Sequence, residues 1–232
     1  MQIYESAFDL EQREAITKKI EEFIENRDQI TMLVIGSPDC KEIKNLSEKI
    51  KEKINLFVFD FEIKRGKISK NFKKSFNFYE EHSGDFFKNI EKIKIKADFV
   101  FHRWFLHHCT DHQKIESFKI IKNLLANEGE LLIIDWMIPD YSSEQERWES
   151  SKKYYKYQKR HGLDIAKSKQ EHNFSKINTP NGKGGKFISH QKLEEIMKKE
   201  NLEFKREILH QSKVEDPELF GANLYICKEG GN

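Results

Sequence analysis

Two strings decide the fold of this chain: ADFVFHRWFLHH at residues 97–108 and EGELLIID at residues 128–135. Each contains a short, wholly apolar run, which is typical of a strand buried on both faces of a parallel sheet. Between them, Thr110 and Gln113 have the spacing of a capping box at the start of a helix. One face of that helix carries Ile115, Phe118, Ile121 and Leu125. The strings therefore predict a strand–helix–strand unit.

The same alternation extends toward the N-terminus. Apolar runs at residues 32–35 and 56–59 predict two earlier strands of the same buried type. Residues 41–53 between them, and residues 9–27 before them, place apolar side chains at helical spacing, so each segment predicts an amphipathic helix.

The alternation also extends toward the C-terminus. Ser189 is the expected N-cap of a further helix, and residues 204–209 and 223–227 predict an antiparallel hairpin at the edge of the sheet. Residues 141–187, in contrast, are polar and aromatic, and form an insertion. Strands that alternate with helices in this way predict an open, doubly wound α/β sheet.

The composition narrows the class of partner. The 232 residues include 41 Lys and Arg against 39 Asp and Glu, so the basic excess typical of nucleic-acid-binding domains is missing. Three cysteines lie far apart without a C-x-x-C pair, which favours a reducing compartment. Neither a signal peptide nor an apolar run of membrane-spanning length is visible. We therefore expect a cytoplasmic protein without nucleic-acid or membrane partners.

Ligands of open α/β sheets bind at the carboxyl ends of the strands, so the residues that follow the apolar runs are the candidates for ligand contacts. In chain order these residues are Gly36 to Cys40, Asp60, Ser83 to Asp85, His102 to His108, and Asp135 with Trp136.

Taken together, these segments resemble the class I, Rossmann-like, S-adenosylmethionine-dependent methyltransferases. The resemblance covers residues 30–137 well and residues 189–227 loosely. It does not cover the N-terminal helix at residues 1–29 or the insertion at residues 141–187. The resemblance implies a mostly parallel, seven-stranded sheet in a single domain over residues 1–232, and the position of the insertion is one where such methyltransferases place a helical lid over the substrate. It also implies methyl transfer from S-adenosylmethionine to a small molecule, with S-adenosylhomocysteine as product. A homodimer is the candidate assembly.

The resemblance assigns cofactor contacts residue by residue. Asp60 corresponds to the acid that accepts hydrogen bonds from the ribose hydroxyls, and Asp85 to the acid that holds the adenine amino group, with Phe86 beside the ring. Gly36, Ser37 and Phe61 complete the expected cofactor-binding set. The alternatives are a capping or turn role for Asp60 and an ordinary Gly-Asp turn at Asp85.

The first loop departs from the family pattern, which places an acid and three glycines there. In VIGSPDC at residues 34–40, only Gly36 remains, Val34 replaces the acid, and Pro38 and Cys40 replace later glycines. Pro38 also removes a backbone donor. The loop is either remodelled around the same cofactor or belongs to a non-catalytic relative that binds the cofactor or a partner subunit.

His102 and Arg103 are the predicted catalytic residues, because they end a strand where the family lines the junction between methyl group and acceptor. A histidine there could take a proton from a hydroxyl, and an arginine could hold an acidic substrate. Either could instead make only a structural hydrogen bond. The cluster His107, His108, Cys109, Asp111 and His112 has the composition of a metal site, but neighbouring side chains at a helix start diverge, so no metal is expected.

Aromatic residues supply the expected substrate contacts. A tyrosine or tryptophan can line an apolar pocket and still offer one polar group. The alternative is that those of the insertion only anchor a helix. The predicted substrate residues are Trp104, Trp136, Trp148, Tyr154 and Tyr155.

Overall fold

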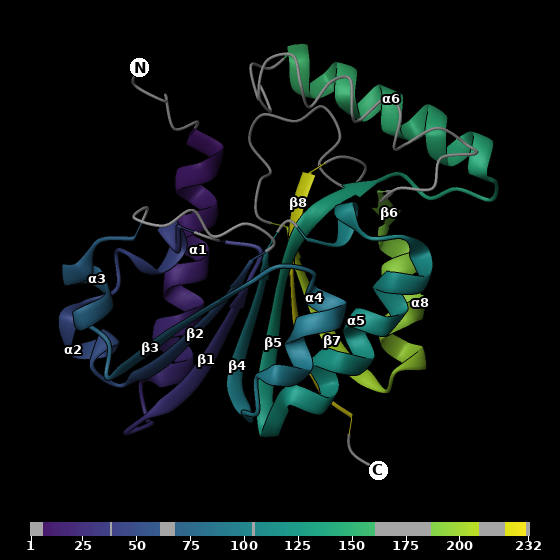
Figure 1. The fold of residues 1–232 in the computed structure, drawn as a ribbon. Coiled ribbons are helices and arrows are strands. Elements are labelled where there is room, and N and C mark those ends of the chain that lie inside the picture. The colour runs from purple at the N-terminus through teal and green to yellow at the C-terminus, as the bar shows by residue number, and fades with distance from the viewer. Residues whose placement is uncertain are drawn as a thin grey trace.

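The computed structural model describes residues 7–37, 39–60, 68–103, 105–160, 187–208 and 221–230. They form one twisted sheet with helices on both faces (Figure 1). The carboxyl ends of the parallel strands point upward in Figure 1, toward the long helix α6.

The sheet has the strand order β3-β2-β1-β4-β5-β8-β7, and the short β6 pairs with β5 outside this path. The first five strands of the order are parallel, whereas β8 runs antiparallel to both β5 and β7. The expected doubly wound, mostly parallel seven-stranded sheet is therefore confirmed. The strands are β1 Ile30–Ile35, β2 Ile54–Asp60, β3 Phe78–Ser83, β4 Ala97–Arg103, β5 Leu125–Ile138, β6 Ile188–Ser189, β7 Leu202–Ile208 and β8 Gly221–Glu229.

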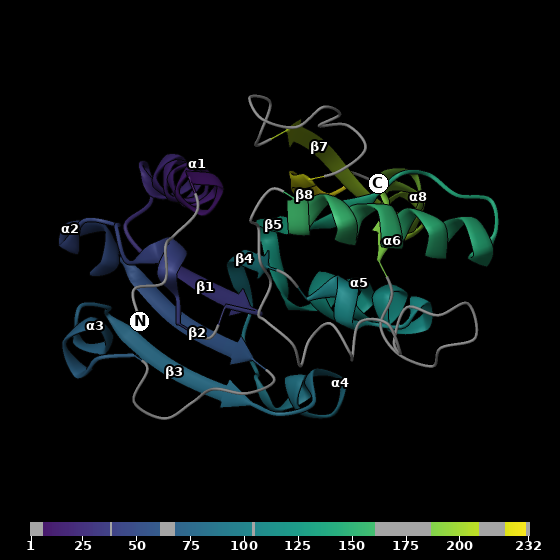
Figure 2. The same ribbon diagram turned by 90° about the horizontal axis from the view of Figure 1, so that it is seen from above.

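Helices cover the sheet in two layers. One face packs against α1, and the other packs against α4, α5 and α8 (Figure 2). The α-helices are α1 Ala7–Ile24, α2 Glu48–Lys51, α3 Lys70–Lys74, α4 Phe86–Asn89, α5 Asp111–Leu124, α6 Glu144–Arg160 and α8 His190–Lys199. Three-residue 3₁₀ helices are η1 Lys41–Ile43, η2 Ile90–Lys92 and η3 Leu106–His108. Within the part of the chain described here, no helix is long and apolar enough to cross a membrane.

Local signals account for the helix boundaries. Thr110 and Gln113 form the predicted capping box of α5, in which each side chain bonds the backbone of the other residue. Ser189 caps α8 as predicted, because its hydroxyl accepts a hydrogen bond from the Lys192 amide.

The predicted continuous helix over residues 41–53 is wrong. The segment forms η1, a break, and then the four-residue α2. The break falls where Ser47 turns its hydroxyl to the Ile50 amide and so starts a new helix. This leaves only a 3₁₀ turn directly after β1, at the place where the sequence predicted the start of a full helix.

Alternation along β4 decides which core each side chain enters. Phe101 packs in the layer that includes α1, and Val100 packs in the layer that includes α5. Since side chains alternate across a strand, His102 lies on the α5 face and Arg103 on the α1 face. The two residues predicted to act together thus point to opposite sides of the sheet.

Candidate functional site at the carboxyl edge of the sheet

The ends of β1 and β4 approach each other closely at Gly36. Gly36 has φ +82°, and a Cβ atom there would lie 2.1 Å from the carbonyl oxygen of Arg103. Only glycine tolerates both the positive φ and this approach. Its amide also donates to the Phe59 carbonyl at 3.0 Å, so Gly36 joins β1 to both neighbouring strands.

Two predicted cofactor acids lie on adjacent strands at this same edge. Asp60 ends β2 and is half-buried, and its register partner Ser83 ends β3. Asp85 follows two residues later, after Gly84, whose amide donates to the Asp60 carbonyl at 3.2 Å. The fold therefore brings Gly36, Asp60 and Asp85 to one edge.

Asp85 has a local structural role as well. Its Oδ1 accepts from the Phe87 amide at 3.1 Å and caps the short helix α4, while its Oδ2 lies 3.4 Å from the Lys88 ammonium. Its side chain remains 41% exposed and so stays accessible to a ligand. Phe86 is buried, and its ring packs against Phe59 and Phe105 with centroids 5.4 and 4.9 Å away.

A buried ionic cluster occupies the α1 side of the edge. Glu42 is 0% exposed, forms an ion pair with Arg103, and accepts a 2.5 Å hydrogen bond from the Ser37 hydroxyl. Arg103 and Ser37 are buried too. The guanidinium that the sequence assigns to substrate is therefore engaged by a carboxylate of the protein itself.

His102 lies on the opposite face, 1% exposed, with its ring edge-on to Phe105 at a centroid distance of 5.0 Å. Neither ring nitrogen has a hydrogen-bond partner among the described residues. Burial lowers the pKa of His102 to about 4, and the nearby Asp135 carboxylate offsets only part of this shift. The imidazole is therefore neutral at neutral pH.

The structure adds a pair that the sequence did not identify. Asp135, near the end of β5, is fully buried, and its Oδ1 lies 2.7 Å from Nδ1 of His107. Its Oδ2 accepts from the Leu106 amide at 2.6 Å, which fixes η3 against the strand. Because a carboxylate accepts hydrogen bonds, this contact places a proton on Nδ1 of a neutral His107 and leaves Nε2 as a base.

His107 is also reachable from solvent, with an 18% exposed side chain. An imidazole oriented by a buried carboxylate is a recurring arrangement for a general base. Both residues were visible in the sequence, because His107 follows one buried apolar run and Asp135 follows the next. Among the described residues, no three His, Cys, Asp or Glu side chains come together as a set of metal ligands.

Known proteins resemble this chain in structure but not detectably in sequence. Neither a known family profile nor a curated protein sequence matches it. A magnesium protoporphyrin IX methyltransferase from Synechocystis PCC 6803, solved with bound SAH, superposes with a TM-score of 0.58 at 10% identity over 98% of this chain and 87% of its own.

Two further solved structures agree. A putative O-methyltransferase from Nostoc punctiforme gives a TM-score of 0.57 at 13% identity over 93% of this chain. The CurJ carbon methyltransferase gives 0.63 at 12% identity over 99%. This chain spans only 56% and 57% of the length of these two proteins. It has the class I methyltransferase fold.

The residues at the edge of this methyltransferase fold match one half of the cofactor better than the other. Asp60 and Asp85 carry carboxylate oxygens, which are acceptors of the kind that ribose hydroxyls and an adenine amino group require. The loop after Gly36 differs, because the Ser37 hydroxyl and the Arg103 guanidinium both contact the Glu42 carboxylate of the protein itself.

The predicted substrate residues lie partly outside the described structure. Trp104 is outside the described residues, as are the side chains of Trp136, Tyr154 and Tyr155, and so is the predicted cofactor contact Phe61. Trp148 lies on α6, with the Lys152 ammonium 3.5 Å from its ring centroid. In Figure 1, α6 crosses above the carboxyl edge of the methyltransferase fold. The substrate assignments and the domain boundaries stay predictions.

The buried ion pair makes a testable contribution to stability. In Glu42→Gln, the Arg103 guanidinium loses its counter-charge without reaching water, so the free energy of unfolding should fall by about 3–5 kcal/mol. The double variant Glu42→Leu/Arg103→Met should recover most of this loss. Urea unfolding measures the free energy of unfolding of both variants. An exposed ion pair contributes less than about 1 kcal/mol, so a loss in that range for Glu42→Gln would contradict a buried ion pair.

The buried imidazole predicts a specific dependence on pH. The unfolded chain binds a proton at His102 below about pH 6.5, whereas the folded chain does so only below pH about 4, so acid favours the unfolded state. Between pH 7 and pH 4 the wild type should lose about 3 kcal/mol more stability than His102→Phe. Urea midpoints at the two pH values measure the difference, and equal losses would refute the assignment.

Proposed function

We propose that this protein is an enzyme that transfers the methyl group of S-adenosylmethionine to a hydroxyl group of a small molecule. The pair of His107 and Asp135 carries the proposal, because it supplies an oriented base at the ligand-binding edge of a methyltransferase fold. Methyl transfer itself needs the acceptor atom to be aligned with the methyl group and water to be excluded. A hydroxyl acceptor also needs a group that takes its proton.

Asp60 would hold the ribose hydroxyls and Asp85 the adenine amino group. Gly36 would form the wall of the cofactor site, with Ser37 and Phe61 as the remaining predicted contacts. When bound there, S-adenosylmethionine supplies the electrophilic methyl group, and S-adenosylhomocysteine is the product.

Proton transfer is assigned to Nε2 of His107 rather than to the predicted His102 and Arg103. His102 is almost completely buried and has a low proton affinity, and Arg103 already pairs with Glu42. Asp135 would stabilise the imidazolium that forms when His107 takes the proton. We therefore propose that Arg103 holds the loop after β1, and that His102 packs beneath the base.

The second candidate function is a non-catalytic relative that binds the cofactor or a partner subunit. One observation favours it: the side chains at the methionine end of the site satisfy each other within the protein. The two functions differ in turnover, so the experiments below separate them.

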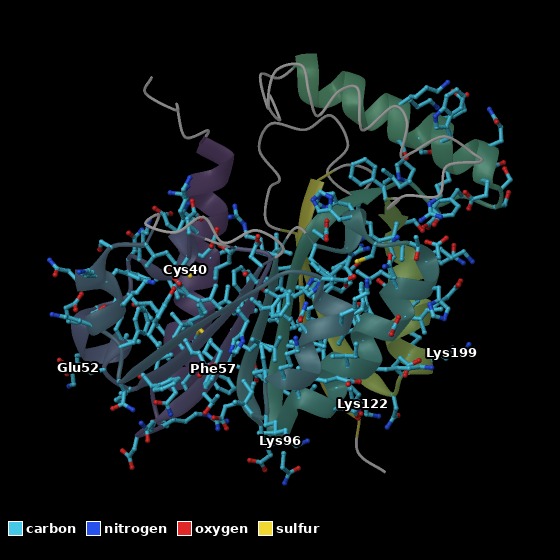
Figure 3. All side chains as sticks on the ribbon, in the orientation of Figure 1. Cys40, Glu52, Phe57, Lys96, Lys122 and Lys199 are labelled. Atoms are coloured by element: carbon cyan, nitrogen blue, oxygen red, sulfur yellow. The ribbon has the colours of Figure 1, made fainter. Side chains whose placement is uncertain are left out.

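The cofactor proposal predicts binding of S-adenosylhomocysteine that depends on Asp60. Since a hydrogen bond to a charged acceptor is worth about 1.5–3 kcal/mol, Asp60→Asn should weaken binding by roughly 10- to 150-fold. Calorimetric titration measures the affinity. Glu52→Gln, on an exposed acid labelled in Figure 3 next to α2, should bind like the wild type. No binding by a folded wild-type protein would refute the proposal.

The base assignment predicts that His107→Gln loses turnover while keeping cofactor affinity. Glutamine can still bond Asp135 but cannot accept a proton, so methyl transfer to a hydroxyl acceptor should fall by about 10²- to 10⁴-fold. The matched control is His112→Gln, because the His112 side chain is 89% exposed on α5. An unchanged rate in His107→Gln, with radiolabelled methyl transfer as the readout, would contradict the assignment.

A further inference from the structure

Arg147 on α6 joins three parts of the chain that lie far apart in sequence. Its side chain is only 3% exposed, and its Nε donates to the carbonyl oxygen of Phe187 at 2.7 Å. Phe187 immediately precedes β6, whose Ile188 pairs with Met137 near the end of β5. One guanidinium thus connects the helix that follows β5 with the residue at which the described chain returns to the sheet.

The same guanidinium makes a two-pronged contact with α5. Its Nη1 and Nη2 each lie 2.7 Å from a different carboxylate oxygen of Asp111, the first residue of the helix. A planar fork on a carboxylate fixes direction as well as distance. The hydrogen bonds from Arg147 outweigh the opposing effect of burial and lower the pKa of Asp111 to about 2, so this contact stays ionic at neutral pH.

Lys114 extends the contact back toward the base. Its ammonium is fully buried, donates to the Cys109 carbonyl at 2.6 Å, and lies 3.3 Å from Asp111. Cys109 directly follows η3, the turn that carries His107. A continuous set of polar contacts therefore runs from Arg147 through Asp111 and Lys114 to the chain next to the base.

Phe187 provides a second connection between Arg147 and His107. The two rings are stacked with centroids 5.8 Å apart and planes inclined by 29°. The His107 ring thus has Asp135 at its Nδ1 and Phe187 across its face. Neither contact fixes the Phe187 backbone, and that is the part of Phe187 that Arg147 binds.

We propose that Arg147 is a positioning residue for methyl transfer, which keeps the His107 ring in its orientation by fixing both Asp111 and Phe187. This inference rests on the proposed function of His107. Arg147 contacts neither the base nor Asp135 directly, so it acts through these two partners. Among the described residues, Glu144 at 3.2 Å and the ring of Tyr141 at 5.0 Å also contact the guanidinium.

The first test does not depend on activity. The ring current of Phe187 should shift the imidazole proton resonances of His107 in NMR spectra, which His107→Gln assigns. In Phe187→Leu this shift disappears, and in Arg147→Met the resonances should move toward the Phe187→Leu positions. Lys152→Met on the same helix, which removes a cation without touching Asp111 or Phe187, should leave them unchanged.

The second test uses turnover. Arg147→Lys keeps the charge but loses the fork and the Nε donor, so it should not restore the wild-type rate. Misplacement of a catalytic group by about 1 Å can cost about 10²-fold, and we expect a kcat loss of that order with the affinity for S-adenosylhomocysteine unchanged. Asp111→Asn, a nearly isosteric change, tests the same contact if Arg147→Met does not fold.

The outcomes separate this inference from the proposed function. Wild-type His107 resonances in both Arg147→Met and Asp111→Asn, while Phe187→Leu shifts them, would overturn the role of Arg147 even if the protein methylates its acceptor. Shifted resonances together with a full rate in Arg147→Lys would also overturn it. A wild type without turnover refutes the proposed function, whereas the NMR comparison still decides whether Arg147 positions the ring.

Discussion

The close approach of β1 and β4 at their carboxyl ends is the constraint on which the rest of the site depends. β1 lies between β2 and β4, so the chain leaves β1 in one direction and returns on its other side, and the edge opens at this switch point. Gly36 allows the Arg103 carbonyl to take the space that any side chain would fill. The Glu42–Arg103 ion pair then ties the loop after β1 to the end of β4 from the α1 side.

Two chemically different halves follow from this junction. On the β2 and β3 side lie Asp60 and Asp85, which we propose bind the nucleoside half of the cofactor. On the β5 side, Asp135 orients His107, and Arg147 connects the same region to α6. A methyl donor bound on the first half would face a proton acceptor on the second. We propose that the loop after β1, which has few glycines, is held in place by the buried Glu42–Arg103 ion pair instead of by the backbone contacts of a glycine-rich turn.

The sequence predicted the buried strands and the capped helices well, because their signals are local. The apolar runs of β1, β2, β4 and β5 and the capping box at Thr110 needed no long-range contact to be recognised. β3 was missed because its mostly polar, partly exposed residues carry no apolar run, and β6 because it has only two residues. Within the site, the direction of His102 and Arg103 depends on strand alternation, and the role of His107 depends on Asp135, a partner 28 residues away.

The measurement that tests the account most directly is a crystal structure of the protein with S-adenosylhomocysteine. We expect the ribose within hydrogen-bond distance of Asp60, the adenine near Asp85, and the sulfur on the side of the edge that faces His107, with the Glu42–Arg103 pair intact. Ligand bound elsewhere, or a Glu42–Arg103 pair that must separate to admit it, would contradict the claim that this ion pair forms part of a working cofactor site.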